Sequence, residues 1–174
     1  MPLISYTIKS ALLAPLFLMI KGGCMISKIL VPTDGSKTAQ KAARYAIDLA
    51  KQLKASIIIL SVIDIRTLMT QSVVPGGETA IYSMEPVEDY LKMAAKGYSG
   101  EIKKLCDRSG VAATVSIKTG HPVEVIVKEA KKSKANLIVM GSHGRSALSA
   151  TVLGSVSYGV IHNDKSIPVL IVRG

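Results

Sequence analysis

The segment Asn136-Leu-Ile-Val-Met-Gly-Ser-His-Gly144 is followed, nine residues later, by Gly154-Ser155. Its first half is an apolar run, which is typical of a strand buried on both faces of a parallel sheet. Its second half places glycines where the strand would end, and a glycine lets the backbone approach a ligand because it has no side chain. Gly154-Ser155 opens a short helical stretch, and unpaired N–H groups at a helix N-terminus favour phosphate. The segment therefore predicts a buried strand with an anion-binding backbone at its carboxyl end.

Apolar strands alternate with amphipathic helices along the rest of the chain. Besides the strand at 136–140, apolar runs predict strands at Lys28–Pro32, Ser56–Val62, Val111–Lys118 and Ile167–Val172. Apolar residues at helical spacing predict helices from Ser36 to Leu53, from Glu85 to Ser109, from Pro122 onward and from Ser155 to His162. This alternation predicts an α/β fold, a doubly wound five-stranded parallel sheet with helices on both faces and right-handed crossovers.

Composition agrees with one globular domain that carries an appendage. The chain has 174 residues, of which 48% are hydrophobic and only 4% aromatic, so its core must be aliphatic. The formal net charge is +10, but the basic residues are spread along the chain and no aromatic residues are interleaved with them. We therefore expect solvated helix faces rather than a nucleic-acid interface.

Residues 1–24 are set apart from the predicted domain, residues 25–174. The extension contains an apolar run, Ala11–Ile20, whose ten residues are too few to span a bilayer, which takes about 20. Met25 begins the first strand–helix unit without a linker, so the extension is either an artefact of start assignment or an exported or membrane-associated segment. Cys24 and Cys106 form no metal pattern with the histidines, which favours a reducing, cytoplasmic setting with no membrane contact beyond the extension. A further irregular stretch, Asp64–Met84, is expected to be a long loop.

Polar residues follow the ends of two predicted strands. Pro32-Thr33-Asp34 ends the first strand, and Met140-Gly141 ends the fourth. In doubly wound sheets ligands bind beyond the carboxyl ends of strands where the strand order reverses, so the two segments would line one crevice if these strands are neighbours there. Three simpler interpretations remain open. Asp34 suits an Asx turn, the glycines suit ordinary turns, and Ser155 suits a helix N-cap.

Several motifs together resemble the universal stress protein family. They are Ile29-Leu-Val-Pro-Thr-Asp-Gly-Ser36, Ser61-Val-Ile-Asp64, Val139-Met-Gly-Ser-His-Gly-Arg145, Leu153-Gly-Ser-Val156 and Pro168-Val-Leu-Ile-Val172. The resemblance implies an adenine nucleotide alpha hydrolase-like, Rossmann-like sheet of order 3-2-1-4-5 and a homodimer formed through the strand Ile167–Val172. It also implies the ATP-binding branch of the family, because this chain keeps every fixed position of Gly-x-x-Gly-x9-Gly-(Ser/Thr).

The resemblance assigns the nucleotide-binding residues of that branch. The adenosine would lie among Pro32, Thr33, Asp34, Val62, Met140 and Gly141. The phosphates would contact Gly144, Gly154, Ser155 and Val156. Arg145 is not assigned by the resemblance, and we expect it either to face solvent or to meet a terminal phosphate. We expect Mg²⁺ or Mn²⁺ to accompany ATP through its phosphates.

The common signatures of nucleotide-processing and hydrolytic enzymes are absent from the sequence. There is no Gly-x-x-x-x-Gly-Lys-(Ser/Thr) loop, no Gly-x-Gly-x-x-Gly fingerprint and no Gly-x-Ser-x-Gly elbow. The sequence therefore favours a regulatory, stress-response module that binds ATP, and we assign no catalytic residue. Two alternatives remain. One is a slow ATPase or nucleotidyl-transferring enzyme that uses Asp34 and Arg145, and the other is a dimeric adaptor that binds no nucleotide.

Overall fold

Strands and helices alternate along the chain as the apolar pattern predicts. The computed structural model describes residues 26–64, 85–145 and 153–173. The predicted extension, 1–24, and nearly all of the predicted loop at 64–84 lie outside these residues. The described strands are β1 (Lys28–Pro32), β2 (Ser56–Ile63), β3 (Ala113–Thr119), β4 (Leu137–Gly141) and β5 (Val169–Val172). The described helices are α1 (Lys37–Leu53), α3 (Glu85–Arg108), α4 (Pro122–Ser133) and α5 (Ser155–Asn163).

The strands form one sheet of order β3-β2-β1-β4-β5, and each neighbouring pair is parallel. This confirms the predicted fold class and strand order. β1 lies at the point where the order reverses, with Ile29 opposite Ile57 of β2 on one side and opposite Leu137 of β4 on the other. The carboxyl ends of β1 and β4 therefore lie next to each other, as the crevice hypothesis requires.

Helix α1 begins and ends at the residues that its sequence favours. The Ser36 hydroxyl at the N-cap accepts a hydrogen bond from the N–H of Ala39 (3.2 Å). Lys54 ends the helix in the left-handed conformation, with φ of 55°. The alanines of α1 face the sheet and are buried. Because alanine is small, the helix axis can approach the sheet closely.

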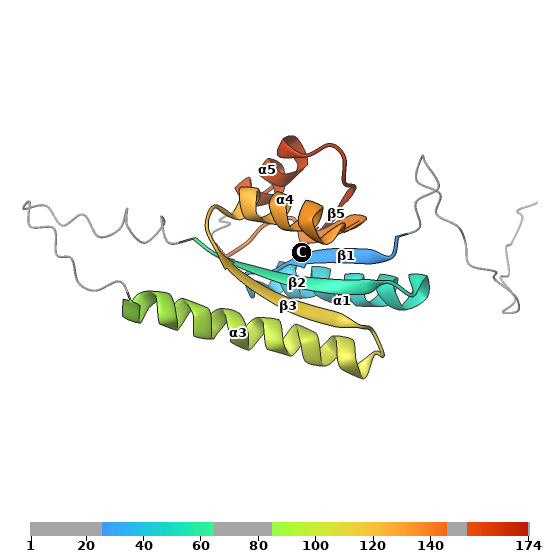
Figure 1. Ribbon diagram of the computed structural model, residues 1–174, viewed down its shortest axis with the longest axis horizontal. Helices are drawn as coiled ribbons and strands as arrows, with labels where there is room; N and C mark the ends of the chain where they lie inside the picture. The colour runs from blue at the N-terminus through green and yellow to red at the C-terminus, as the bar shows by residue number, and fades with distance from the viewer. Residues whose placement is uncertain (1–25, 65–84, 146–152, 174) are drawn as a thin grey trace, which may run out of the picture.

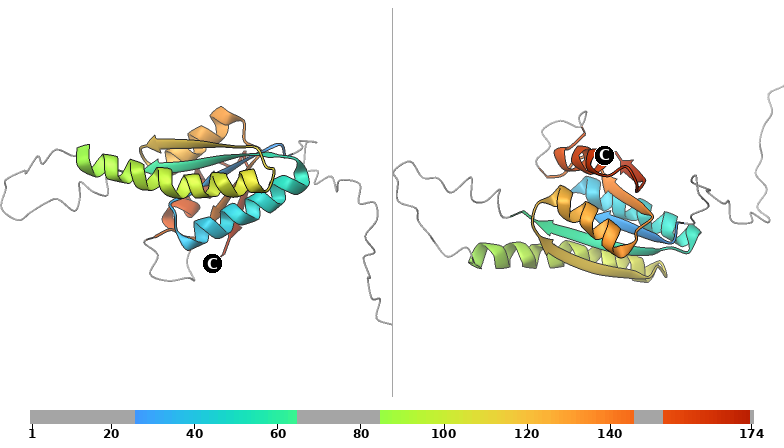
Figure 2. Two further views of the ribbon diagram at one scale, coloured as in Figure 1. Left: turned by 90° about the horizontal axis from the view of Figure 1, so that it is seen from below. Right: turned by 45° about the horizontal axis from the view of Figure 1, so that its top comes forward.

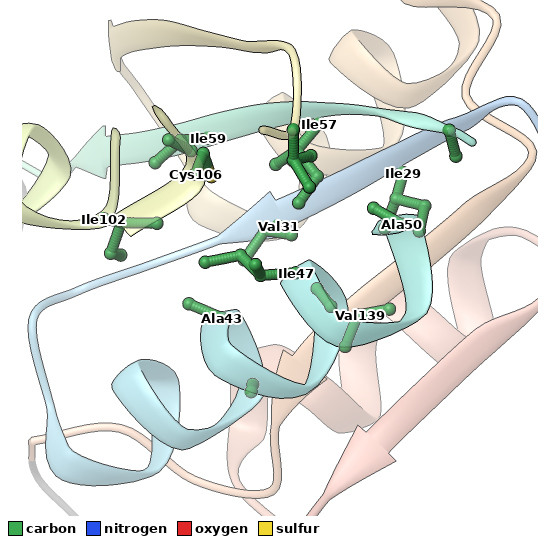
Figure 3. Close-up of a cluster of buried hydrophobic side chains, with 14 of the residues drawn as sticks. Ile29, Val31, Ala43, Ile47, Ala50, Ile57, Ile59, Ile102, Cys106 and Val139 are labelled. Atoms are coloured by element: carbon green, nitrogen blue, oxygen red, sulfur yellow. The ribbon is translucent and has the colours of Figure 1, made fainter. Parts of the chain in front are cut away.

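Two layers of helices cover the sheet. Figure 1 shows α4 and α5 above the sheet and α3 below it, and Figure 2 shows α1 and α3 together on the lower face. Successive residues of a strand point to opposite faces. In β1, Ile29 and Val31 therefore pack towards α1 and α3 (Figure 3), whereas Leu30 packs towards α4 and α5. All three are fully buried.

The last strand is shorter than its apolar pattern suggests. β5 begins at Val169 rather than at Ile167. The carbonyl of Pro168 accepts a hydrogen bond from the N–H of Ile138 (3.0 Å), but proline has no N–H to extend the ladder. β3 likewise begins at Ala113, two residues later than predicted. The remaining strands and helices agree with the predicted ranges to within about two residues.

Candidate functional site

A cavity of about 710 Å³ lies at the carboxyl ends of β1 and β4. The structure brings every predicted site residue to its wall: Pro32, Thr33, Asp34, Val62, Met140, Gly141, Gly144, Arg145, Gly154, Ser155 and Val156. These residues come from three separate parts of the sequence. The volume lies within the range of about 300–1,000 Å³ that is usual for small-molecule sites.

Asp34 joins the two loops that border the cavity. Its Oδ1 accepts a hydrogen bond from the N–H of Ser36 (3.0 Å), which forms the Asx-type turn that the sequence left open. Its Oδ2 accepts one from the N–H of Arg145 (3.0 Å), across 111 positions of the chain. Asp34 therefore has a structural role, and its position in the cavity wall remains compatible with a ligand role.

The glycines of the motif lie where two parts of the backbone meet. A Cβ on Gly144 would lie 2.6 Å from Oδ2 of Asp34. A Cβ on Gly141 would lie 3.0 Å from the carbonyl carbon of Thr38, and one on Gly154 would lie 3.0 Å from Cα of His143. The space beside each glycine is therefore filled by the protein itself. In this structure the glycines let the two loops touch, and the close approach of a ligand to their backbone stays a prediction.

Helix α5 begins at the cavity wall, and its N-cap is not the residue that one sequence interpretation suggested. Gly154 is the N-cap residue, and its carbonyl accepts the hydrogen bond from the N–H of Tyr158 (2.9 Å). Ser155 is the first helical residue, so the interpretation of Ser155 as the N-cap is wrong. Glycine and serine both suit an N-cap, and the sequence could not choose between them.

The start of α5 is fixed by polar contacts to β4 and its loop. The N–H of Gly154 donates to the carbonyl of Ser142 (2.7 Å), and the hydroxyl of Ser157 donates to the carbonyl of Gly141 (2.8 Å). The first N–H groups of a helix have no partner within the helix. Those of Ser155, Val156 and Ser157 lie at the cavity wall, where the positive end of the helix dipole attracts an anion.

The loop after β4 is fastened to α1 as well. The hydroxyl of Thr38 donates to the carbonyl of His143. The Nδ1 of His143 lies 2.9 Å from the hydroxyl of Ser142. His143 itself lines the cavity. These contacts hold the segment Gly141–Arg145 against α1, so this part of the cavity wall is formed by hydrogen bonds within the protein.

The opposite end of the cavity is apolar. Leu60 and Val62 from β2 face Ile126 and Pro122 from α4, with Met140 from β4 beside them. Sequence reasoning found Val62 and Met140 but missed the rest of the lining: Ala39, Leu60, Asp64, Pro122, Ile126, His143, Leu153 and Ser157. Ile126 and Pro122 could not be found because they reach the cavity only through the crossover that places α4 over the sheet. A flat apolar ligand group would fit between these side chains.

Charged groups are few at the cavity wall. Among the described lining residues Asp34 and Asp64 are the carboxylates, and Arg145 is the one guanidinium. Within residues 26–64, 85–145 and 153–173 no group of three or more His, Cys, Asp or Glu side chains is placed to hold a metal ion. None of the helices in the same ranges is both long and apolar enough to cross a bilayer.

Comparison with known proteins gives the same family over nearly the whole chain. Residues 25–173 match the model of the universal stress protein family. Universal stress protein MJ0531 of Methanocaldococcus jannaschii is 35% identical over 152 residues, which cover 87% of this chain and 85% of the relative. Universal stress protein MJ0577 of the same organism is 38% identical over 157 residues, which cover 86% and 96%.

Solved structures share the fold. A structure of protein MJ0577 superposes with a TM-score of 0.72 at 33% identity, covering 87% of this chain and 98% of that one. A universal stress protein in complex with cAMP superposes with a TM-score of 0.59 at 24% identity, covering 86% and 98%.

Proposed function

The chain belongs to the universal stress protein family, and we propose that it binds ATP between β1 and β4 as a nucleotide-dependent regulatory module of the stress response. The observation that carries the proposal is the N-terminus of α5 at the wall of a cavity whose other end is apolar. An adenine nucleotide has the matching shape, a flat base at one end and an anionic chain at the other. Adenine would lie between Val62 and Ile126, and the phosphates would lie at Ser155 and Val156.

The proposal rests on the residues of this chain. One structural neighbour was solved in complex with cAMP, a ligand with adenine, ribose and a phosphate, and its likeness to this chain is one of fold. The anion-binding end here is the backbone of Gly154–Ser157, and Arg145 is the one lysine or arginine among the described lining residues. We expect Mg²⁺ or Mn²⁺ to be held mainly by the phosphates, with Asp34 as a neighbouring carboxylate.

A regulatory role follows from where the nucleotide would lie. It would contact both loops that Asp34 joins, the one after β1 and the one after β4. A ligand that contacts both loops favours the arrangement in which they are together and so changes the surface presented to a partner. Backbone N–H groups that bind the ground and transition states equally hold ATP without accelerating its cleavage, as a regulatory module requires.

Calorimetric titration of ATP into three proteins tests the site. Ser155→Asp places a carboxylate in the first turn of α5, where it suits the helix dipole but repels phosphate. Ser155 is exposed, so the substitution disturbs no packing. We expect wild type to bind ATP and Ser155→Asp to bind it about tenfold or more weakly.

Ser155→Asn is the matched control, because it has the size of aspartate without the charge. We expect its affinity to stay within about threefold of wild type. Wild type that binds no ATP, or Ser155→Asp that binds it as tightly as Ser155→Asn, would contradict the proposal. Gly154→Val is a more drastic variant, because its side chain would press on His143, and we expect it to abolish binding.

Two related measurements decide the remaining parts of the proposal. Labelled ATP held with the protein for hours distinguishes a binding module from a slow ATPase by the product formed.

Gel filtration at micromolar concentration tests the homodimer through Ile167–Val172, where β5 is an edge strand of the described sheet and its four residues are all partly exposed. We propose a cytoplasmic location because Cys106 is a buried, free thiol.

A further inference from the structure

The side chain of Arg145 lies against an aromatic ring of α3. Its guanidinium carbon is 5.4 Å from the centroid of the Tyr98 ring. That distance is within the range of a cation–π interaction. Arg145 is an exposed residue of the cavity wall, and Tyr98 is half-buried and does not line the cavity. The guanidinium therefore lies against a side chain that is not part of the cavity wall.

Gly35 lies on the other side of the Arg145 guanidinium. Its φ is +79°, a conformation that side chains rarely adopt. A Cβ on Gly35 would lie 2.8 Å from Nη2 of Arg145 and 2.7 Å from Cδ1 of Tyr98. Any side chain at this position would therefore displace the guanidinium or the ring. We refer to the space between Gly35 and Tyr98 as the arginine niche.

Tyr98, one side of the arginine niche, belongs to the face of the sheet opposite the apolar part of the cavity. Leu60 and Val62 of β2 line the cavity, so Ser61 between them points to the opposite face, where α1 and α3 lie. The hydroxyl of Ser61 is 2.7 Å from the hydroxyl of Tyr98, which fixes the ring on that face. The backbone N–H of Arg145, in contrast, is held at the cavity wall by Asp34. The guanidinium thus contacts Tyr98 and Gly35, which do not line the cavity, while the backbone of Arg145 is bonded to Asp34 in the wall.

We propose that the arginine niche makes Tyr98 a specificity-determining residue, which sets how strongly the site prefers ATP over AMP. In the niche the guanidinium lies against Tyr98 and Gly35. A nucleotide with a terminal phosphate draws Arg145 out of the niche, whereas AMP leaves it there because its single phosphate lies at Ser155. Leaving the niche forfeits the cation–π contact, and this loss reduces the affinity for ATP but not for AMP.

This inference rests on the proposed function and adds a consequence for α3. When ATP is bound, the face of Tyr98 that Arg145 covers becomes open. The number of phosphates in the cavity is then reported on the opposite face of the sheet, where α1 and α3 form the surface (Figure 2). Two states of one side chain, each favoured by a different ligand, are what a population shift requires.

Calorimetric titrations of ATP and AMP into Tyr98 variants test the inference. Tyr98→Leu removes the aromatic face, so Arg145 is free to reach a terminal phosphate. We expect its affinity for ATP to rise about two- to fivefold, the equivalent of one exposed cation–π contact, and its affinity for AMP to stay unchanged. Tyr98→Phe keeps the ring and loses only the contact to Ser61, so both affinities should stay near those of wild type. In an Arg145→Gln background, Tyr98→Leu should change neither affinity.

A second measurement needs no Tyr98 variant. In NMR spectra of the wild type, the ring protons of Tyr98 should shift when ATP is added and should not shift with AMP, and in Arg145→Gln they should shift with neither. If Tyr98→Leu changes both affinities alike, lowers the affinity for ATP, or acts equally without Arg145, the inference is wrong. Wild type that binds no ATP would instead remove the proposed function itself, so the two failures are distinguishable.

Discussion

The two faces of the sheet share the same strands and differ in how completely helices cover them. On the face of α1 and α3, Val31 and Ile59 are fully buried in a continuous aliphatic cluster (Figure 3). On the face of α4 and α5, Leu30 and Leu60 are equally buried, but the cluster ends at a cavity of about 710 Å³. One sequence of alternating side chains therefore builds a packed core on one face and a ligand-sized cavity on the other.

Helix length accounts for the difference. α1 has 17 residues and α3 has 24, whereas α4 has 12 and α5 has 9. At 1.5 Å per residue, α1 extends over about 26 Å and α5 over about 14 Å. The short α5 starts only at Ser155, after the loop that follows β4. Among the described residues, no helix therefore covers the carboxyl ends of β1 and β4 on this face. The cavity is made by where α5 begins as much as by the residues that line it.

The largest expected effect is a loss of stability on the packed face. Val31→Ala deletes two buried methyl groups where nothing can collapse into the space, and we expect a loss of about 2–3 kcal/mol in the free energy of unfolding. Val62→Ala makes the same deletion in a half-buried residue at the cavity wall, where it should cost less than about 1 kcal/mol. Urea unfolding of the two variants measures both. Equal losses would mean that the two faces are packed alike and that the cavity wall is not distinct.

A pair of glycine substitutions is expected to have the next largest effect. A Cβ on Gly141 would meet the backbone of Thr38 and Ala39 at 3.0 and 3.1 Å, so Gly141→Ala should cost about 1–2 kcal/mol in stability. Gly97 lies in α3 with nothing within 4 Å of its Cβ position. Gly97→Ala should raise stability by about 0.5–1 kcal/mol, because alanine favours a helix more than glycine does. Thermal unfolding measures whether Gly141→Ala lowers and Gly97→Ala raises the stability. A destabilised Gly97→Ala would contradict the prediction that its Cβ position is open.

The sequence predicted the fold well because burial follows the periodicity of each element. β1 and β2 are apolar on both faces, α1 has its alanines at helical spacing, and Ser36 caps the helix as expected. Gly110, which was expected to end α3, indeed follows its last turn with φ of +70°. These signals are local, so a sequence contains them in full. The order of the strands, in contrast, came from the family resemblance.

The sequence predicted residues that line the candidate cavity, but it did not predict the contacts among them. Glycine is favoured both where a ligand approaches and where two loops touch. The sequence therefore could not tell whether Gly144 lies next to Asp34 or next to a bound phosphate. The same ambiguity led to Ser155 rather than Gly154 being considered as the N-cap. The contact between Arg145 and Tyr98 joins residues far apart in the sequence and in different layers, and no local pattern marks it. Contacts between residues so far apart are formed only when the helices between the strands bring the two segments together.

The smallest expected effect concerns an acidic residue on the cavity side of the sheet. Asp164, which ends α5, has a side chain that is only 4% exposed, and its Oδ2 lies 2.6 Å from the Nζ of Lys131 on α4. Its Oδ1 accepts hydrogen bonds from the N–H and the hydroxyl of Ser166. Lys131 and then Ser166 hold the pKa of the Asp164 carboxyl well below its usual range. Apolar clusters hold the helices on both faces of the sheet, and α4 and α5 are joined by this charged pair in addition (Figure 3 shows the cluster on the face of α1 and α3).

The sign of the pH dependence follows from the lowered pKa. A carboxyl whose pKa is lower in the folded state contributes stability above its unfolded pKa, about 4, and loses that contribution as the pH falls towards the folded pKa. Asp164→Asn should therefore be less stable than wild type at neutral pH, by about 1 kcal/mol, since Lys131 is 58% exposed and regains water when the pair is broken. The difference between the two proteins should shrink below about pH 4. Urea unfolding of both at pH 7 and at pH 3 measures this change, and the comparison cancels the titration of every other carboxyl. A difference that stays constant with pH would mean that Asp164 acts through its shape alone, and that the charge of its pair with Lys131 adds nothing to the apolar packing of α4 and α5.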